Sequence, residues 1–130
     1  MDRSTTALVL IDMQEDVVRG RWWTWWPDVD GVLERNELLV AGCRQRGVPV
    51  LFTAVEYLAD GSNTPQALAG AQPATTEYLV TGTAGVDLVP SLQPRPDELV
   101  AVKNLVSAFD ARGFSDALDR LGTTSLVVAG

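Results

Sequence analysis

The chain has 130 residues, 46% of them hydrophobic and 21% charged, which is typical of one globular domain rather than of a disordered segment. Its formal net charge of −7 argues against a nucleic-acid partner, because such a surface needs clustered Lys and Arg. No apolar run approaches the roughly 18 residues of a membrane span and no signal peptide precedes the first apolar run, so we expect a cytoplasmic protein without a membrane partner.

The first part of the chain predicts a strand, a helix and a second strand. The apolar run at 7–11 lacks the alternation of a half-exposed strand, so both of its faces are expected to be covered. Apolar residues then recur at helical spacing over about 29–46, with Asp28 or Asp30 as the capping residue and a Gly-x-Pro stretch at the end. A second continuous apolar run follows at 48–55.

The long connection that follows, residues 56–98, breaks this rhythm. It is rich in Gly, Pro, Ser and Thr, and a connection of this length is either functional or mobile. A third apolar run lies at 99–102, and a shorter helix is predicted at about 116–121, with Ser115 as its N-cap and Gly122 as its stop. The residues of this helix that are expected to face the sheet are Ala117, Leu118 and Leu121.

The last apolar run covers residues 125–130, and, like the other three, it is expected to be buried on both faces. The order strand, helix, strand, followed by strand, helix, strand, is typical of βαβ units in a parallel sheet. The sequence therefore predicts one α/β domain over residues 1–130.

Two of the predicted strands run into a charged residue at their carboxyl ends, Asp12 after the first and Lys103 after the third. In open parallel sheets, ligands bind in the crevice outside these ends. A partly desolvated carboxylate suits a proton acceptor, and a lysine beside it can steady it and stabilise developing negative charge. The alternative is that each residue simply ends its strand at a turn. If they share a site, the carboxylate and ammonium lie within roughly 2.7–3.2 Å, or are bridged by one water.

Five stretches, in this order, resemble the isochorismatase-like cysteine hydrolases. The matching stretches are residues 7–14, 47–53, 82–90, Lys103 with 107–109, and 121–122 leading into 126–130. The resemblance implies a three-layer, Rossmann-like α/β fold with a doubly wound parallel sheet of six strands. Residues 1–130 are then expected to be the amino-terminal portion of the hydrolase domain, with strands one to four, and its C-terminal part is missing from them.

The resemblance also implies a catalytic Asp-Lys-Cys triad. By motif match, Asp12 is the base that activates the thiol and Lys103 is its electrostatic partner. The family's cysteine starts the helix after the fourth strand, a few residues past the glycine that matches Gly130. A helix N-terminus lowers the pKa of a thiol and supplies N–H donors for an oxyanion. The 130 residues do not include this segment.

Cys43 does not replace the family's cysteine in this interpretation, because it lies on the apolar stripe of the first predicted helix and is expected to pack in the core. As the sequence has no histidine, Ser-His-Asp and Cys-His catalysis are excluded and a catalytic zinc site is disfavoured. Metal-dependent relatives bind an ion through an Asp and two His after the second strand. Residues 55–60 lack these histidines, so we expect no metal and no other cofactor.

Candidate substrate-binding residues lie in the loop after the first predicted strand and at three further positions. Four tryptophans, Trp22, Trp23, Trp25 and Trp26, fall in the loop that edges the substrate pocket in the family. Exposed indoles would favour aggregation, so they are expected to form a pocket wall, a subunit interface or part of the core. Further pocket candidates are Thr53, Tyr57 and Phe109.

The function that the resemblance implies is hydrolysis of a small amide, carbamoyl or vinyl-ether substrate in a homo-oligomer. The alternative is a catalytically dead domain of the same fold that serves binding or assembly. For the 130 residues by themselves we expect no hydrolase activity, because they lack the nucleophile. We also expect them to aggregate or to pair with another chain, because the outer edge of the fourth strand has no partner strand.

Overall fold

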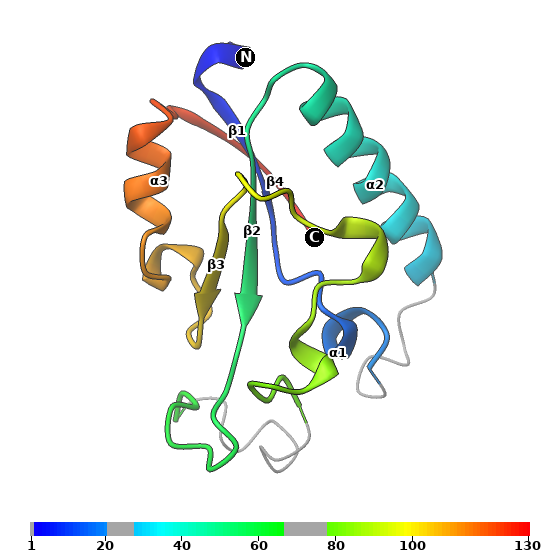
Figure 1. Cartoon of the computed structure of the whole chain (residues 1–130), viewed down its shortest axis with the longest axis vertical. Coiled ribbons are helices and arrows are strands. Elements are labelled where there is room, and N and C mark those ends of the chain that lie inside the picture. Colours follow the sequence, from blue (N-terminus) through cyan, green and yellow to red (C-terminus); the bar gives the residue numbers. More distant parts are fainter. Residues whose placement is uncertain (1, 21–27, 67–77) are drawn as a thin grey trace.

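The computed structural model describes residues 2–20, 28–66 and 78–130. Its four strands form an all-parallel sheet in the order β3-β2-β1-β4 (Figure 1). The strands are β1 (Thr6–Leu10), β2 (Val50–Val55), β3 (Val100–Lys103) and β4 (Ser125–Ala129). All four predicted strands are therefore confirmed, with bounds that differ by one or two residues.

Helices cover both faces of the sheet, which confirms the predicted three-layer architecture (Figure 1). The α-helices are α1 (Glu15–Val18), α2 (Val29–Gln45) and α3 (Phe114–Arg120), and the short 3₁₀ turns are η1 (Arg3–Thr5), η3 (Ala84–Val86), η4 (Pro90–Leu92) and η5 (Ala108–Asp110). Within the described part of the chain, no helix combines the length and the apolar character needed to cross a bilayer.

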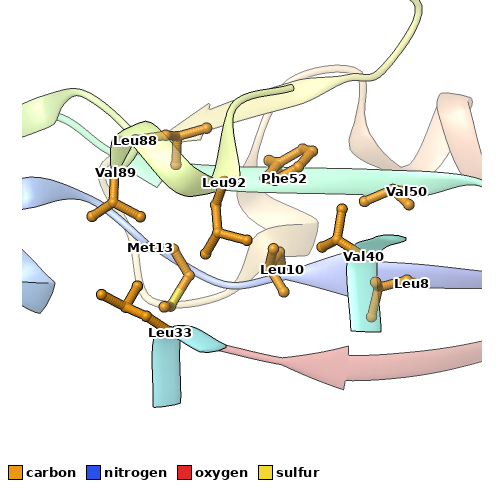
Figure 2. Packing of buried hydrophobic residues seen from close by; sticks show 10 residues of the cluster. All are labelled: Leu8, Leu10, Met13, Leu33, Val40, Val50, Phe52, Leu88, Val89 and Leu92. Carbon is orange, nitrogen blue, oxygen red and sulfur yellow. The ribbon is translucent and has the colours of Figure 1, made fainter. Parts of the chain in front are cut away.

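Alternate residues of the central strands pack into two apolar layers, one on each face of the sheet. Leu8 and Leu10 of β1 pack with residues of α2, whereas Ala7 and Val9 pack with residues of α3. Because successive strand side chains point to opposite faces, this alternation requires a helix on each side. Figure 2 shows the α2 side, where the long connection also contributes Leu92 to the layer.

The connection between β2 and β3 is anchored to the start of the chain. The Val89 N–H donates to the Met13 carbonyl at 2.9 Å, and the Glu15 N–H donates to the Asp87 carbonyl at 2.9 Å. Leu92 is 1% exposed. The part of this connection that follows residue 77 is therefore built into the core, which disfavours the mobile alternative for that part.

The first predicted helix is confirmed. It spans Val29–Gln45, and the Asp28 carboxylate caps it by accepting a hydrogen bond from the Gly31 N–H at 3.1 Å. This is the usual way in which an N-cap side chain satisfies a free N–H of the first turn.

The start of the second helix was predicted wrongly. It begins at Phe114 after Gly113, whose φ of 82° is left-handed, so Ser115 lies inside the helix and not at its N-cap. Phe114 is 1% exposed, and its burial extends the helix toward its N-terminus. Ala117 and Leu118 face the sheet as expected, but Leu121 lies beyond the last helical residue and is 42% exposed.

The prediction that all four strands are covered on both faces is wrong for β3, and within residues 1–130 it is not met at Val128 of β4. Every residue of β1 and β2 is buried, but Val102 of β3 is 46% exposed and Val128 of β4 is 63% exposed. A continuous apolar run identifies a strand, but its place in the strand order decides how much of it the helices cover.

Candidate active site

Three adjacent strands bring Asp12, Thr53 and Lys103 together. Asp12 follows β1 by two residues, Thr53 lies inside β2, and Lys103 is the last residue of β3. Since β2 lies between β1 and β3, the Thr53 side chain is placed between the other two. The three residues share the carboxyl edge of one parallel sheet, where ligands bind in open α/β folds.

Asp12 and Lys103 form an ion pair in which the Lys103 Nζ donates to the Asp12 Oδ2 at 2.8 Å. The predicted proximity is confirmed, although the catalytic roles of both residues stay predictions. The Lys103 side chain is 1% exposed and that of Asp12 is 20% exposed. A buried ammonium is costly unless it is paired, so the carboxylate explains how the lysine can be held inside the protein.

The second oxygen of Asp12 is held by Thr53. The Thr53 hydroxyl donates to the Asp12 Oδ1 at 2.5 Å, and the Asp12 N–H donates to the same hydroxyl oxygen at 3.2 Å. Thr53 is 0% exposed. Its buried hydroxyl faces Asp12, and its role in substrate binding stays a prediction.

Asp12 also has an unusual backbone conformation. Its φ of 51° lies in the left-handed region, which few residues other than glycine adopt, although aspartate is among those that do. The Gln14 N–H donates to the Asp12 carbonyl at 2.8 Å, which closes a tight turn directly after the strand. This turn ends the extended course of β1 and leaves the carboxylate in contact with β2 and β3.

Sequence reasoning missed the role of Gln14, which is 0% exposed. Its amide nitrogen donates to the carbonyls of Val55 at 2.9 Å and Val86 at 2.8 Å, and its amide oxygen accepts from the Val55 N–H at 2.8 Å. It therefore ties the Asp12 turn to the end of β2 and to the long connection. The signal for it was a polar side chain two residues after Asp12, inside the matched stretch 7–14.

Gly130 lies beside the same turn, at the end of β4. Its φ is 144°, and a Cβ at this position would come within 2.3 Å of the Ile11 carbonyl oxygen. Because there is no room for a side chain here, glycine is required for this close approach. The carboxyl end of β4 is thus held against the residue that precedes Asp12.

The cavity beside Asp12 is small, at about 30 Å³, and its lining is mostly apolar. The residues that line it are Ile11, Asp12, Met13, Val17, Val18, Val29, Val32 and Gly130. A larger open cavity of about 930 Å³ lies along α1 and residues 84–94, and none of Asp12, Thr53 and Lys103 lines it. We give more weight to the small cavity, because the buried ion pair lies beside it.

The other predicted pocket residues are not drawn into this cluster. Tyr57 is 3% exposed and belongs to an apolar cluster with Tyr78 and Leu79, so its place is in the core. Phe109 is 60% exposed, and its ring packs edge-to-face on Phe114 with centroids 5.2 Å apart. Their role in substrate binding stays a prediction. Trp22, Trp23, Trp25 and Trp26 lie outside the described residues.

Cys43 is a packing residue, as predicted. It is partly buried against the α2-side core, and burial raises the pKa of its thiol. The Val48 N–H donates to the Cys43 carbonyl at 3.0 Å, which places Cys43 near the start of β2 and hence at the edge opposite Asp12. In residues 2–20, 28–66 and 78–130 there is no group of three or more Cys, Asp or Glu side chains suited to hold a metal ion.

A family model, described as the isochorismatase domain, matches residues 6–130 of this chain. A comparison with curated proteins found no match. Among solved structures, an isochorismatase family protein from Desulfovibrio vulgaris is 30% identical, with a TM-score of 0.75 over 96% of this chain and 65% of that one.

Two more distant structures show the same fold. A cysteine hydrolase from Pseudomonas syringae is 19% identical, with a TM-score of 0.83 over 98% of this chain and 60% of that one. An N-carbamoylsarcosine amidase from Thermoplasma acidophilum is 20% identical, with a TM-score of 0.79 over 95% of this chain and 66% of that one. The chain thus spans 60% to 66% of the length of these three proteins.

Proposed function

Because the chain belongs to the isochorismatase domain family, we propose that residues 1–130 are the amino-terminal portion of a cysteine hydrolase that needs no cofactor. Its substrate would be a small amide, carbamoyl compound or vinyl ether. The observation that carries this proposal is the ion pair at the carboxyl edge of the sheet, in which a buried Lys103 holds a partly exposed Asp12. Membership of a hydrolase family and the position of the pair at the carboxyl edge of the sheet both favour an active site at this edge.

In this proposal Asp12 is the general base. Of the three polar residues in the cluster it is the one that reaches the surface, since its side chain is 20% exposed, against 1% for Lys103. A carboxylate offers about four lone-pair positions, and the contacts with Thr53 and Lys103 use one on each oxygen. A reacting group can therefore approach Asp12 while the other two residues hold it.

Lys103 would stabilise negative charge in the reaction. An ammonium has three N–H donors, and within the described residues Lys103 donates to Asp12 alone. The remaining donors are fixed in a site with little water, where such donors lower the energy of a developing anion most.

The nucleophile would be a thiol from a segment that follows Gly130. Gly130 lies against Ile11 at the edge that carries Asp12, so a chain continuing from it starts next to the base. For an amide or carbamoyl substrate, Asp12 would accept the thiol proton as the sulfur bonds to the carbonyl carbon, and would return it to the amine as the C–N bond breaks. Water would then cleave the C–S bond, which releases the acid and restores the thiol.

The alternative is a catalytically dead binding or assembly domain of the same fold. The single cysteine of the 130 residues, Cys43, lies near the start of β2 and cannot reach Asp12. The choice between the two functions therefore depends on whether a thiol follows Gly130.

The test is to express the full gene product and assay it on small amides, carbamoyl compounds and vinyl ethers. We expect turnover, and inactivation by iodoacetamide with the label on a cysteine after Gly130. Asp12→Asn should lower turnover about 10²–10⁴-fold, the usual contribution of a general base. The matched control is Asp119→Asn, an exposed acid on α3, which should leave turnover unchanged. A gene without such a cysteine, or parent-like turnover by a folded Asp12→Asn protein, would contradict the proposal.

A further inference from the structure

We propose that Thr53 is a positioning residue whose hydroxyl fixes the carboxylate of Asp12 for reaction. The proposal rests on the proposed role of Asp12 as the base and deepens it, because it names the group that holds the base in place. In this assignment Thr53 acts through Asp12 and does not itself touch the substrate.

The hydrogen bonds define which way the Thr53 hydroxyl points. The Asp12 N–H donates to its oxygen at 3.2 Å, so one lone pair is occupied. A carboxylate can only accept, so the hydroxyl proton is directed to the Asp12 Oδ1, 2.5 Å away. Because the acceptor is a carboxylate, this bond is charge-assisted and stronger than a bond between neutral groups.

Two different strands hold the two oxygens of the carboxylate. Thr53 of β2 holds Oδ1, and Lys103 of β3 holds Oδ2. The terminal torsion of an aspartate is otherwise broad, so one contact would leave the carboxylate plane free to turn. With both contacts the plane is set, and a fixed orientation matters because small misplacements of a reacting group cost much of the rate.

Thr53 also supports the strained backbone of Asp12. Its hydroxyl and its carbonyl oxygen both accept from the Asp12 N–H, at 3.2 and 3.3 Å. A left-handed aspartate, with a φ of 51°, persists only where its surroundings hold it. One residue thus holds both the turn and the carboxylate.

Packing by itself does not explain a threonine at this position. Thr53 is 0% exposed, and burying a hydroxyl is unfavourable unless it is hydrogen-bonded. Valine has the same shape and is well suited to a buried strand. The hydroxyl must therefore have a specific partner, and Asp12 provides it.

The experiment separates the hydroxyl from the shape of the side chain. In the full gene product, Thr53→Val removes the hydroxyl at constant shape, and Thr53→Ser keeps it. We expect Thr53→Val to lower kcat about 10- to 100-fold with little change in KM, which corresponds to losing one hydrogen bond to a charged group. Thr53→Ser should retain most of the activity.

The matched control is Thr6→Val. Thr6 is 4% exposed in β1, and its hydroxyl donates to the Asp2 carbonyl at 2.5 Å, so the substitution removes the hydroxyl of a buried strand threonine away from Asp12, here from a part-buried bond to a neutral acceptor. It should change the melting temperature but not kcat. If Thr53→Val does not fold, Thr53→Ala and Thr53→Ser form a second pair that differs only in the hydroxyl.

A second readout does not depend on turnover. The buried Lys103 ammonium should give a slowly exchanging ¹⁵N NMR signal in the parent and in Thr53→Ser, and a shifted or faster-exchanging one in Thr53→Val. Parent-like kcat in Thr53→Val, or equal loss in the Val and Ser variants, overturns the proposal. If the parent itself shows no turnover, the proposed function fails, and the Lys103 signal then tests the positioning role of Thr53. A parent-like signal in Thr53→Val overturns that role, and a changed signal supports it.

Discussion

The two ion pairs at opposite edges of the sheet differ in how many of their donors and acceptors are hydrogen-bonded within the protein. At the amino edge, Arg44 holds Glu98 through two hydrogen bonds, at 2.8 and 2.6 Å, and also donates to the Gln93 carbonyl at 2.9 Å. Glu98 accepts a further bond from the Arg95 N–H at 2.8 Å. The hydrogen bonds of this pair therefore join α2 to the residues that precede β3.

At the carboxyl edge, the Asp12–Lys103 pair keeps part of its capacity unused. Within the described residues, Lys103 uses one of its donors, and the exposed member is the acid rather than the cation. The Asp12 turn is also left-handed, whereas no such strain accompanies the Arg44–Glu98 pair. This difference is why we propose the Asp12–Lys103 pair, and not the Arg44–Glu98 pair, as the one that serves a ligand.

The largest effect is expected when Lys103 is replaced by Met. Turnover of the full gene product should fall about 10²–10³-fold, because a donor for the developing anion is lost. The free energy of unfolding should fall as well, because Asp12, whose side chain is 20% exposed, loses its counter-ion and keeps only its bond to Thr53. Steady-state kinetics and urea unfolding measure the two effects. Parent-like turnover in a folded variant would remove Lys103 from the site.

The matched substitution at the other edge, Arg44→Met, should lower stability without lowering turnover. Glu98, whose side chain is 9% exposed, would lose its two-point partner, so the free energy of unfolding should fall by about 1.5–3 kcal/mol. Turnover of the folded protein should be unchanged. If Arg44→Met instead lowered turnover as much as Lys103→Met, with stability intact, the contrast between the two pairs would be wrong.

The Arg44–Glu98 pair should also make stability depend on acid pH. Burial acts to raise the pKa of Glu98, but the hydrogen bonds from Arg44 and the Arg95 N–H outweigh it, so the pKa is lowered in the folded protein. Its contribution is full above the unfolded pKa, about 4.3, and is lost as pH falls through the folded value. The difference in unfolding free energy between the parent and Glu98→Gln should therefore shrink in acid. A difference that is constant from neutral to acid pH would contradict this.

The smallest effect is expected for Cys43→Ser. Since Cys43 packs against the α2-side core near the amino edge, turnover should change by less than a few-fold. The half-buried hydroxyl should cost about 1 kcal/mol of stability. The parent thiol should react slowly with a disulfide reagent, because burial raises its pKa and only the thiolate reacts. Loss of turnover in a folded Cys43→Ser protein would mean that the nucleophile has been assigned wrongly.

The sequence by itself determined the elements whose signals are local. The apolar spacing and the Asp28 cap predicted α2, and continuous apolar runs predicted the four strands. Asp12 and Lys103 could be singled out because each closes such a run, and parallel strands present their carboxyl ends at one edge. These features depend on residues that are near one another in the chain.

The tertiary structure decided what depends on strand order. Thr53 and Asp12 are 41 residues apart and Lys103 and Asp12 are 91 apart, and β2 had to lie between β1 and β3 for their side chains to meet. Burial of Phe114 placed the start of α3 one residue before Ser115, and the outer position of β3 left Val102 exposed. The strand ends predicted that Asp12 and Lys103 lie close together, but the partner of Thr53 and the burial of Phe114 depend on neighbours distant in sequence that no local pattern identifies.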